Sequence, residues 1–377
     1  MKTISSLPSP RPVDASGIVT WVHIGDLHLT GPEDQNSRDL HSIVDTLNRN
    51  FSTGVNFVFL PGDMAEHGQP AEFALVRAAL DRLEIPWFSI IGDHDVHTHS
   101  FDAYCEAILP AEHYSFNCGG YLFLALNAFS RPAPNSFTVD DAQLCFIDDR
   151  LATLPAGDRA VLFLHCYPSD LKAGYEALRD RIVRHRPLLV EMGHTHYNEI
   201  ARDTSTVYVV TRSTGQIEEG TVGFSITSLD RGCVSWKFRD LASTEPFVMI
   251  TSPADWRLTP VGSPAPGPVQ EVRARIWSDA PVGSVYALCN HQAPIPMEPI
   301  AGTNVWQATW PPALESGTFI RVVAETVDGR EAFDEVRILD PQLTRLAPRD
   351  QDNAIGAWPE RHILGTQLGP NKNGKKW

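Results

Sequence analysis

Short apolar runs recur along the first two thirds of the chain. They are rich in β-branched and aromatic residues, carry almost no charge and have the length of a strand, which is typical of strands buried on both faces. We expect strands at residues 18–24, 55–60, 86–91, 121–127, 160–165, 187–192 and 206–211.

Between several of these runs, apolar residues return every three or four positions, which is the period of a helix with one buried face. The residues that mark three such helices are Leu40, Ile43, Val44 and Leu47; Phe73, Val76, Leu80 and Leu83; and Leu144, Ile147 and Leu151. Strands that alternate with helices predict an α/β fold, with layered β-sheet flanked by helices on both faces.

The pattern changes after a proline-rich linker. Beyond it Val272, Ala274 and Ile276 alternate with two arginines, and later segments behave similarly, which predicts a small all-β sandwich without helices. The expected division of the chain is an N-terminal extension at 1–17, an α/β domain at 18–250, the linker at 251–265, a β-sandwich accessory domain at 266–341 and a C-terminal tail at 342–377.

The tail is polar and rich in glycine and proline, but it also carries scattered large apolar residues. Such anchors predict a tail that packs on the body, whereas disorder is the alternative. The tail residues that could close over a pocket and contact an anion are Trp358, His362, Asn371, Lys372 and Lys375.

The charge and composition exclude several classes of protein. A hydrophobic content of 42% is that of a globular chain, and a formal charge of −15 repels long nucleic acids. The six cysteines form no CxxC pair, so we expect mostly buried free thiols. Because no signal-like segment and no run of 18 apolar residues is found, we expect a cytoplasmic protein without membrane insertion.

Polar clusters follow five of the predicted strands directly. In chain order they are Asp26-x-His28, Gly62-Asp63, Gly92-Asp93-His94-Asp95, His165, and Gly193-His194-Thr195-His196. The carboxyl ends of strands in an α/β sheet gather at one edge, so clusters that are distant in sequence can meet there. Mixed imidazole and carboxylate donors favour Mn, Fe, Zn, Co or Ni over calcium.

Taken in order, these blocks resemble the calcineurin-like metallophosphoesterases, whose pattern is DxH, GDxx[DE], GNH[DE], a lone His and GHxH. The resemblance covers about residues 18–240 and implies a metallophosphoesterase-type sandwich with two divalent metal ions. One ion would be held by Asp26, His28, Asp63 and His196. The other would be held by Asp63, Asp93, His165 and His194, so that Asp63 bridges the two.

The resemblance also implies how such a site acts. A hydroxide that bridges the ions would attack phosphorus, while His94 would stabilise the transition state and protonate the leaving oxygen. Glu66 would orient and charge the His94 imidazole, although an acid near a helix N-terminus can also be merely solvated. Asp95 would fix the loop that carries the block.

Position 93 departs from the family pattern, because Asp93 stands where the family has Asn. A third carboxylate lowers the net charge of the metal site and supplies no amide donor. We therefore expect a preference for singly charged diesters over dianionic monoesters. The alternatives are a phosphomonoesterase and a non-hydrolytic metal- or phosphate-binding protein with an altered site at Asp93.

Within the family, the segment "GDMAEHG" has no tyrosine for a purple acid phosphatase site and lacks the arginine-rich extension of Ser/Thr protein phosphatases. The nearest resemblance is to the bacterial class III cyclic-nucleotide phosphodiesterases. It implies a small phosphate-ester substrate, with cyclic nucleotides among the candidates. The β-sandwich could cover the site, brace the sheet or form a homo-oligomer.

Other histidines and tyrosines lie near the motifs. His97 and His99 could line the mouth of the site or be ordinary loop residues. Tyr167 and Tyr197 could stack on an aromatic group or simply pack. We expect His23 in the core, and His41 and His185 on helices without motif partners.

Overall fold

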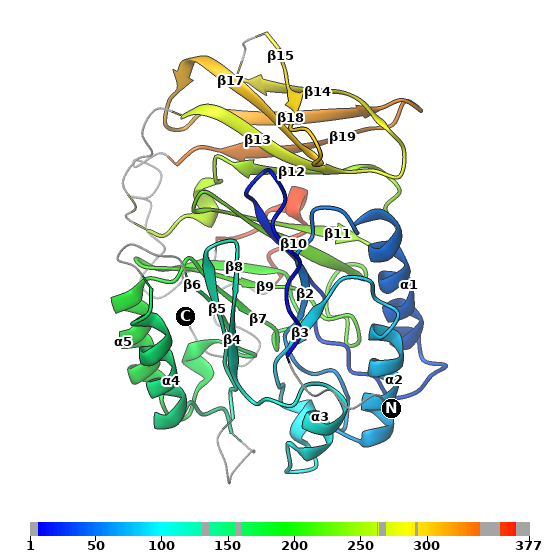
Figure 1. Ribbon diagram of the computed structural model, residues 1–377, viewed down its shortest axis with the longest axis vertical. Helices are drawn as coiled ribbons and strands as arrows, with labels where there is room; N and C mark the ends of the chain where they lie inside the picture. The colour runs from blue at the N-terminus through cyan, green and yellow to red at the C-terminus, as the bar shows by residue number, and fades with distance from the viewer. Residues whose placement is uncertain are drawn as a thin grey trace.

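The structure of the chain is a computed structural model, which describes residues 7–129, 136–154, 160–261, 263, 269–290, 293–339 and 355–366. It contains a larger sandwich of two sheets with helices outside and a smaller all-β sandwich stacked on one end (Figure 1). The predicted fold class, an α/β layered sandwich followed by a C-terminal all-β sandwich, is confirmed.

The first sheet of the larger sandwich combines parallel and antiparallel strands. Its members are β1 (Val19–His23), β2 (Phe57–Leu60), β3 (Trp87–Ser89), β10 (Gly223–Asp230) and β11 (Cys233–Asp240). They are ordered β11-β10-β1-β2-β3. Strands β1, β2 and β3 are parallel, so their carboxyl ends lie at the same edge.

The second sheet has a parallel centre and antiparallel edges. Its members are β4 (Tyr114–Cys118), β5 (Tyr121–Ala125), β6 (Ala160–Phe163), β7 (Leu189–Met192), β8 (Glu199–Arg202) and β9 (Val207–Val210), ordered β4-β5-β6-β7-β9-β8. The pairs β5–β6, β6–β7 and β7–β9 are parallel. All seven predicted strands are confirmed.

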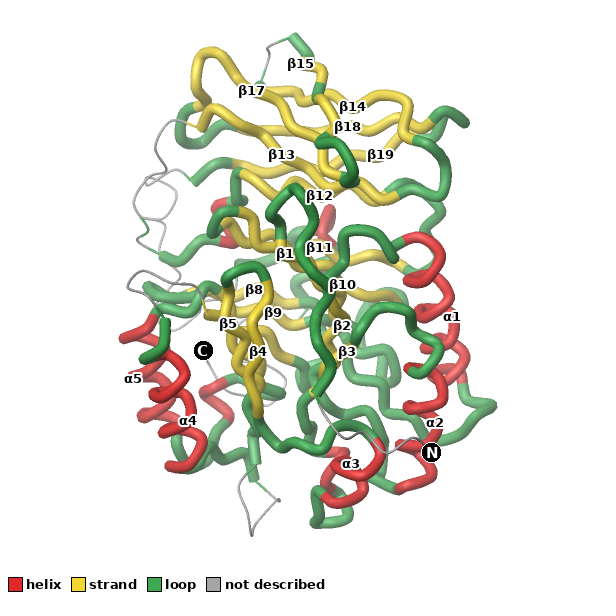
Figure 2. The backbone as a smooth tube through the Cα atoms, viewed as in Figure 1, coloured by secondary structure: helices red, strands yellow, loops and turns green. Residues whose placement is uncertain are grey.

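Helices cover the outer faces of both sheets (Figure 2). Beside the first sheet lie α1 (Gln35–Asn50), α2 (Pro70–Leu80) and α3 (Asp102–Ala107), and beside the second lie α4 (Asp141–Leu151) and α5 (Tyr175–His185). Helices α1, α2 and α4 correspond to the predicted ones and bury the predicted apolar faces, except that Leu83 lies beyond the end of α2 and is only partly buried. Short 3-10 turns, η1 (His94–Val96) and η2 (Pro168–Asp170), follow β3 and β6.

The smaller sandwich begins before the predicted linker. Its sheets are ordered β12-β13-β17-β16 and β15-β14-β18-β19, and β12 (Phe247–Ser252) precedes residue 253. Val248 and Ile250 belong to the core of the smaller sandwich, whereas Phe247 and Met249 belong to that of the larger one. Because both faces of β12 are apolar, its sequence is one continuous apolar run. The boundary between the two sandwiches therefore cannot be recognised in the sequence. The other strands are β13 (Val269–Trp277), β14 (Val282–Cys289), β15 (Ile295–Pro296), β16 (Glu298–Pro299), β17 (Val305–Leu314), β18 (Phe319–Thr326) and β19 (Glu331–Arg337).

The arginines of β13 join the two sandwiches. Val272, Ala274 and Ile276 fill the smaller core as the alternation predicts, but Arg273 and Arg275 are also buried. The Arg273 guanidinium donates to Asp230 on β10, and that of Arg275 donates to Asp14 at 3.0 Å. The polar face of β13 therefore packs against the larger sandwich.

The described part of the tail packs between the sandwiches. Arg361, in the 3-10 turn η4 (Pro359–Arg361), donates to the main-chain oxygen of Trp236 and to the Asp334 carboxylate at 2.7 Å. Trp358 is 2% exposed beneath the Arg257 guanidinium, so its ring does not close over a pocket. Asn371, Lys372 and Lys375 lie outside the described residues.

All six cysteines are thiols rather than disulfides, and Cys118, Cys166 and Cys289 are buried. Among the described residues, no helix is both long and apolar enough to cross a bilayer.

Candidate metal centre

The predicted polar clusters come together at the carboxyl ends of strands from both sheets. Asp26, Asp63 and Asp93 follow β1, β2 and β3, while His165 follows β6. His194 and His196 follow β7. Because the strands point toward one end of the sandwich, loops from five positions in the sequence converge there.

The seven predicted ligands form two overlapping groups in which the potential ligand atoms lie within 4.8 Å of one another. The first group is Asp26, His28, Asp63 and His196, and the second is Asp63, Asp93, His165 and His194. Asp63 belongs to both groups, as a bridging ligand would.

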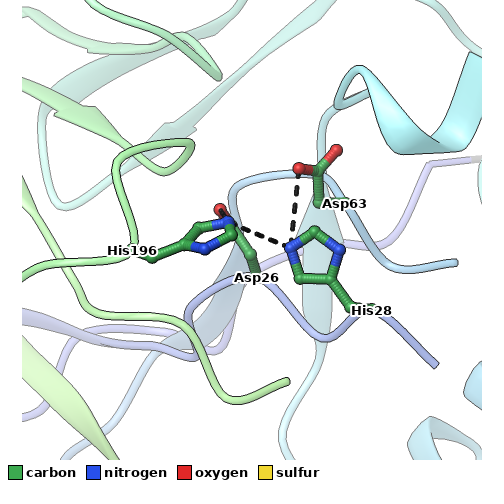
Figure 3. A group of neighbouring side chains, drawn as sticks. All are labelled: Asp26, His28, Asp63 and His196. Atoms are coloured by element: carbon green, nitrogen blue, oxygen red, sulfur yellow. Dashed lines mark hydrogen bonds and ion pairs between the residues drawn. The ribbon is translucent and has the colours of Figure 1, made fainter. Parts of the chain in front are cut away.

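His28 contacts two other members of the first group, His196 and Asp63 (Figure 3). Its Nε2 lies 3.0 Å from Nε2 of His196 and 3.7 Å from Oδ2 of Asp63. The Nε2 of His196 in turn lies 3.5 Å from Oδ2 of Asp26. Four donor atoms from three loops therefore face one small space.

Asp93 occupies the middle of the second group. Its Oδ1 lies 3.0 Å from Nε2 of His165 and 3.1 Å from Nδ1 of His194. The same Nε2 of His165 lies 3.5 Å from Oδ2 of Asp63. The residue that departs from the family pattern thus takes part in this group directly.

The backbone of the site is unusual. Four of the seven residues have a left-handed φ, namely His28 at 48°, Asp63 at 49°, and His194 and His196 at 67° each. Non-glycine residues rarely adopt this region, and such strain concentrates at functional sites.

The glycines of the motifs permit close approach between the loops. A Cβ at Gly92 would lie 2.2 Å from the main-chain nitrogen of Asp63, and one at Gly193 would lie 2.3 Å from Oδ1 of Asp26. Any side chain at these positions would push the loops apart. The glycines therefore set the spacing of the carboxylates.

The donor atoms fit divalent metal ions. Oδ1 of Asp26 and Oδ2 of Asp63 are buried and accept no hydrogen bond from the described residues, which is costly unless a cation satisfies them. The Nδ1 atoms of His28 and His165 lie 2.8 and 2.7 Å from Glu66 Oε2 and the Pro61 main-chain oxygen. These oxygens only accept, so each Nδ1 donates its proton to one of them and each Nε2 faces the cluster, where it can bind a cation.

Burial and neighbouring charged groups shift the pKa values of three residues in the cluster. Burial raises the pKa of Asp26. Burial would also raise the pKa of Asp93, but hydrogen bonds from His165 and His194 hold it well below its usual range. Burial lowers the pKa of His165, yet Asp63 and Asp93 raise it well above its ordinary value. A cation that binds Nε2 of His165 must therefore displace a proton from that imidazole.

His94 lies beside the two groups. Its Nδ1 donates to the main-chain oxygen of Glu66 at 2.9 Å, and its main-chain N–H donates to Oδ1 of Asp63 at 2.9 Å. Its ring centroid lies 4.5 Å from that of His28. Burial lowers the pKa of His94, but Asp63 and the hydrogen bond to Glu66 outweigh it, so the pKa is raised overall.

The Glu66 carboxylate interacts mainly with His28. It lies 2.8 Å from His28 Nδ1 but 3.6 Å from His94 Nδ1, so the main chain of Glu66, rather than its side chain, makes the shorter contact with His94. It also accepts from Nε2 of Gln216 at 2.9 Å. These contacts contradict the alternative of a merely solvated acid. Gln216 belongs to no motif, and no sequence signal identified it.

Asp95 is buried beneath the loop. Its Oδ1 accepts from the main-chain nitrogens of Met64 and Ala65 at 2.9 and 3.0 Å, and its Oδ2 accepts from that of Gly92 at 3.0 Å. It thereby ties the second block to the third. Burial raises its pKa to about 7.

The remaining histidines and tyrosines take different positions. His97 and His99 are exposed and line a cavity that also touches Asp93. Tyr167 is fully buried with its hydroxyl 3.1 Å from Glu199, so it packs rather than stacks on a ligand. The partly exposed Tyr197 donates to Glu218 at 2.8 Å. His23 is in the core, as predicted, and His41 and His185 lie on α1 and α5.

One protein family matches part of the chain. The family model described as calcineurin-like phosphoesterase matches residues 20–198. No curated protein matches the chain in sequence.

Several solved structures are similar to this chain. A dimetal phosphatase from Danio rerio has 16% sequence identity and a TM-score of 0.51, over 60% of this chain and 97% of that chain. GAP50, the anchor in the inner membrane complex of Plasmodium, has 14% identity and a TM-score of 0.45, over 60% and 85%. YfcE, a phosphoesterase from E. coli, has 12% identity and a TM-score of 0.32, over 59% and 94%. At such identities the likeness to the Danio rerio structure concerns the fold alone.

Proposed function

Because residues 20–198 carry a calcineurin-like phosphoesterase domain, we propose that the chain hydrolyses phosphodiesters with the help of two divalent metal ions. The observation that carries this proposal is the pair of overlapping four-residue groups that share Asp63. Two adjacent sites with a common carboxylate suit a pair of ions acting on one phosphoryl group.

In this proposal, one ion is held by Asp26, His28, Asp63 and His196. The other is held by Asp63, Asp93, His165 and His194. When bound, such ions lower the pKa of water toward neutrality and neutralise charge on the phosphoryl oxygens. The buried, unsatisfied oxygens of Asp26 and Asp63 support this assignment.

His94 is proposed as the residue that acts on the substrate. Its Nδ1–H is held by the main-chain oxygen of Glu66, which leaves Nε2 as the atom that can exchange a proton. In the protonated ring Nε2–H can donate to a phosphoryl oxygen and then to the leaving oxygen. The main-chain hydrogen bond from His94 to Asp63 fixes its place beside the ligand groups.

Glu66 and Asp95 are proposed as positioning residues. Glu66 holds Nδ1 of His28, so it fixes the ring and increases the basicity of the ligating Nε2. Asp95 holds three main-chain N–H groups of the two blocks that carry Asp63 and Asp93. Neither residue needs to touch the substrate.

The preference for diesters rests on Asp93. Three carboxylates, Asp26, Asp63 and Asp93, oppose two dications and leave a net charge of roughly +1, whereas an amide at position 93 would leave roughly +2. Lowering the positive charge weakens the attraction for a dianionic monoester more than the attraction for a monoanionic diester, so it shifts the preference toward diesters. The resemblance to class III cyclic-nucleotide phosphodiesterases extends the proposal to cyclic nucleotides as candidate substrates.

The test is to strip the protein with a chelator and re-load it with Mn, Fe, Zn, Co or Ni. Hydrolysis of bis(p-nitrophenyl) phosphate is then compared with that of p-nitrophenyl phosphate. Metal-dependent cleavage of the diester with little cleavage of the monoester is the expected result. Cleavage of the monoester alone would make the chain a phosphomonoesterase, and metal binding without cleavage of either ester would contradict the enzymatic proposal.

A further inference from the structure

A cavity of about 400 Å³ lies beside the second ligand group. Its described lining includes Asp93 at the metal centre, together with His97, His99, Phe137 and Lys172. This volume lies within the range of small-molecule sites, roughly 300–1,000 Å³. The proposed ligands account for Asp93, but they leave the other four residues without a role.

One wall of the cavity follows the third motif. Residues 94–96 form η1, and His97 and His99 come directly after it. The ring of His97 lies 4.5 Å from that of His94. The histidines beyond the motif therefore continue the surface that begins at the proposed catalytic imidazole.

Another part of the lining is a pair of loop segments held together by main-chain contacts. The main-chain nitrogen of Lys172 donates to the main-chain oxygen of Phe137 at 2.8 Å, and Thr138 bridges Ala173. A Cβ at Gly174 would lie 2.0 Å from the main-chain oxygen of Val139, so the glycine permits this close approach. Phe137 and Lys172 are thus fixed relative to each other.

Phe137 also contacts the metal centre. Its ring lies 4.8 Å from that of His194 in an edge-to-face arrangement, with an interplanar angle of 82°. The ring is partly exposed and lines the cavity. An apolar surface therefore begins beside one of the proposed metal ligands.

We propose that this cavity binds the organic group of the phosphoester and selects an aromatic group that carries a second negative charge. Phe137 offers an apolar face to a ring, and Lys172 supplies the one ammonium group of the described lining. In a chain with a formal charge of −15, an anionic group needs such a local cation. This inference rests on the proposed phosphoesterase function and names a substrate class for it.

The test uses ligands that cannot be hydrolysed, so that it does not depend on turnover. Methylphosphonate, phenylphosphonate and 4-phosphonobenzoate share a phosphoryl-like head and differ in the group that would enter the cavity. Their dissociation constants are measured by calorimetry on the full metal-loaded chain. We expect phenylphosphonate to bind about tenfold more tightly than methylphosphonate, and 4-phosphonobenzoate about fivefold more tightly still.

Variants test whether Lys172 causes the preference for a ligand with a second negative charge. Lys172→Met should remove the advantage of 4-phosphonobenzoate over phenylphosphonate and leave methylphosphonate binding unchanged, while Lys172→Arg should restore most of it. Arg184→Gln removes one positive charge from the exposed face of α5, outside the cavity lining, and should change none of the three constants.

Equal affinities for the three ligands would overturn the inference, as would an equal effect of Lys172→Met on all of them or the absence of any binding. The proposed function fails separately, when neither p-nitrophenyl ester is cleaved by the same metal-loaded protein.

Discussion

Nδ1 of His23 lies 2.8 Å from Oε1 of Glu191, and both side chains are fully buried between the two sheets of the larger sandwich. His23 is on β1 and Glu191 is on β7. Each stands three positions before a residue of the metal centre, Asp26 or His194. The pair therefore joins two strands, one from each sheet, that both lead into the candidate site.

Replacing Glu191 should destabilise the fold. Its carboxylate also accepts from Nε1 of Trp21 at 2.5 Å, so Glu191→Gln leaves buried donors facing an amide. We expect the free energy of unfolding, measured by urea denaturation of the metal-free protein, to fall by about 3 kcal/mol. Glu176→Gln, at an exposed side chain of α5, is the control and should lower the free energy of unfolding by less than about 0.5 kcal/mol. A similar small cost for both variants would show that the pair contributes little.

Gln216 should influence metal affinity without being a ligand. It donates to Glu66, which holds Nδ1 of His28. Gln216→Leu removes that support, so we expect the first ligand group to bind its ion about tenfold more weakly. Competition with a chromogenic chelator measures this affinity. Gln35→Leu, at an exposed position at the start of α1, should leave this affinity unchanged, and an unaltered affinity in Gln216→Leu would refute the role of Gln216.

Glu199 should make stability depend on pH. Burial raises its pKa from 4.5 to about 7, so between these values the folded state holds a proton that the unfolded state has lost. The contribution of Glu199 to stability is therefore complete below about pH 4.5 and is lost as the pH rises through about 7.

Glu199→Gln keeps an acceptor for the Thr195 hydroxyl, which now donates at 2.7 Å, but cannot titrate. The free energy of unfolding of the wild type should fall by about 2 kcal/mol more than that of the variant between pH 5 and 7. Urea denaturation at several pH values, at one fixed metal concentration, gives both curves. Parallel curves would exclude a raised pKa at this position.

The preference between esters should depend on position 93. Asp93→Asn restores the amide of the family pattern and removes one of three carboxylates from the ligand groups. We expect kcat/KM for p-nitrophenyl phosphate to rise about tenfold relative to that for bis(p-nitrophenyl) phosphate. If the ratio of the two constants stays the same in the variant, the charge of residue 93 does not set the preference.

The sequence predicted the strands that are apolar throughout and the polar clusters that follow them. It did not reveal β10, because Ser225, Thr227 and Ser228 are buried there. Their hydroxyls are satisfied by partners distant in sequence, such as Thr20 for Ser228 at 2.8 Å and Thr211 for Ser225. Burial of this kind depends on tertiary contacts and leaves no apolar signal.

Dependence on tertiary contacts also explains why the sequence did not predict some of the residues near the site. Asp26, His28 and Asp63 stand in motifs with recognisable spacing. Gln216 and Lys172 belong to loops whose place depends on packing against other segments, and no motif marks them. The shared strand β12 was likewise hidden, since its two faces enter two different cores.

In the proposed centre, both metal ions depend on Asp63. The most direct measurement is the number of ions per chain, determined by equilibrium dialysis and elemental analysis of the wild type and two variants. We expect about two ions in the wild type, about one in His196→Ala and almost none in Asp63→Ala. An Asp63→Ala protein that is folded and still retains two ions would contradict this expectation.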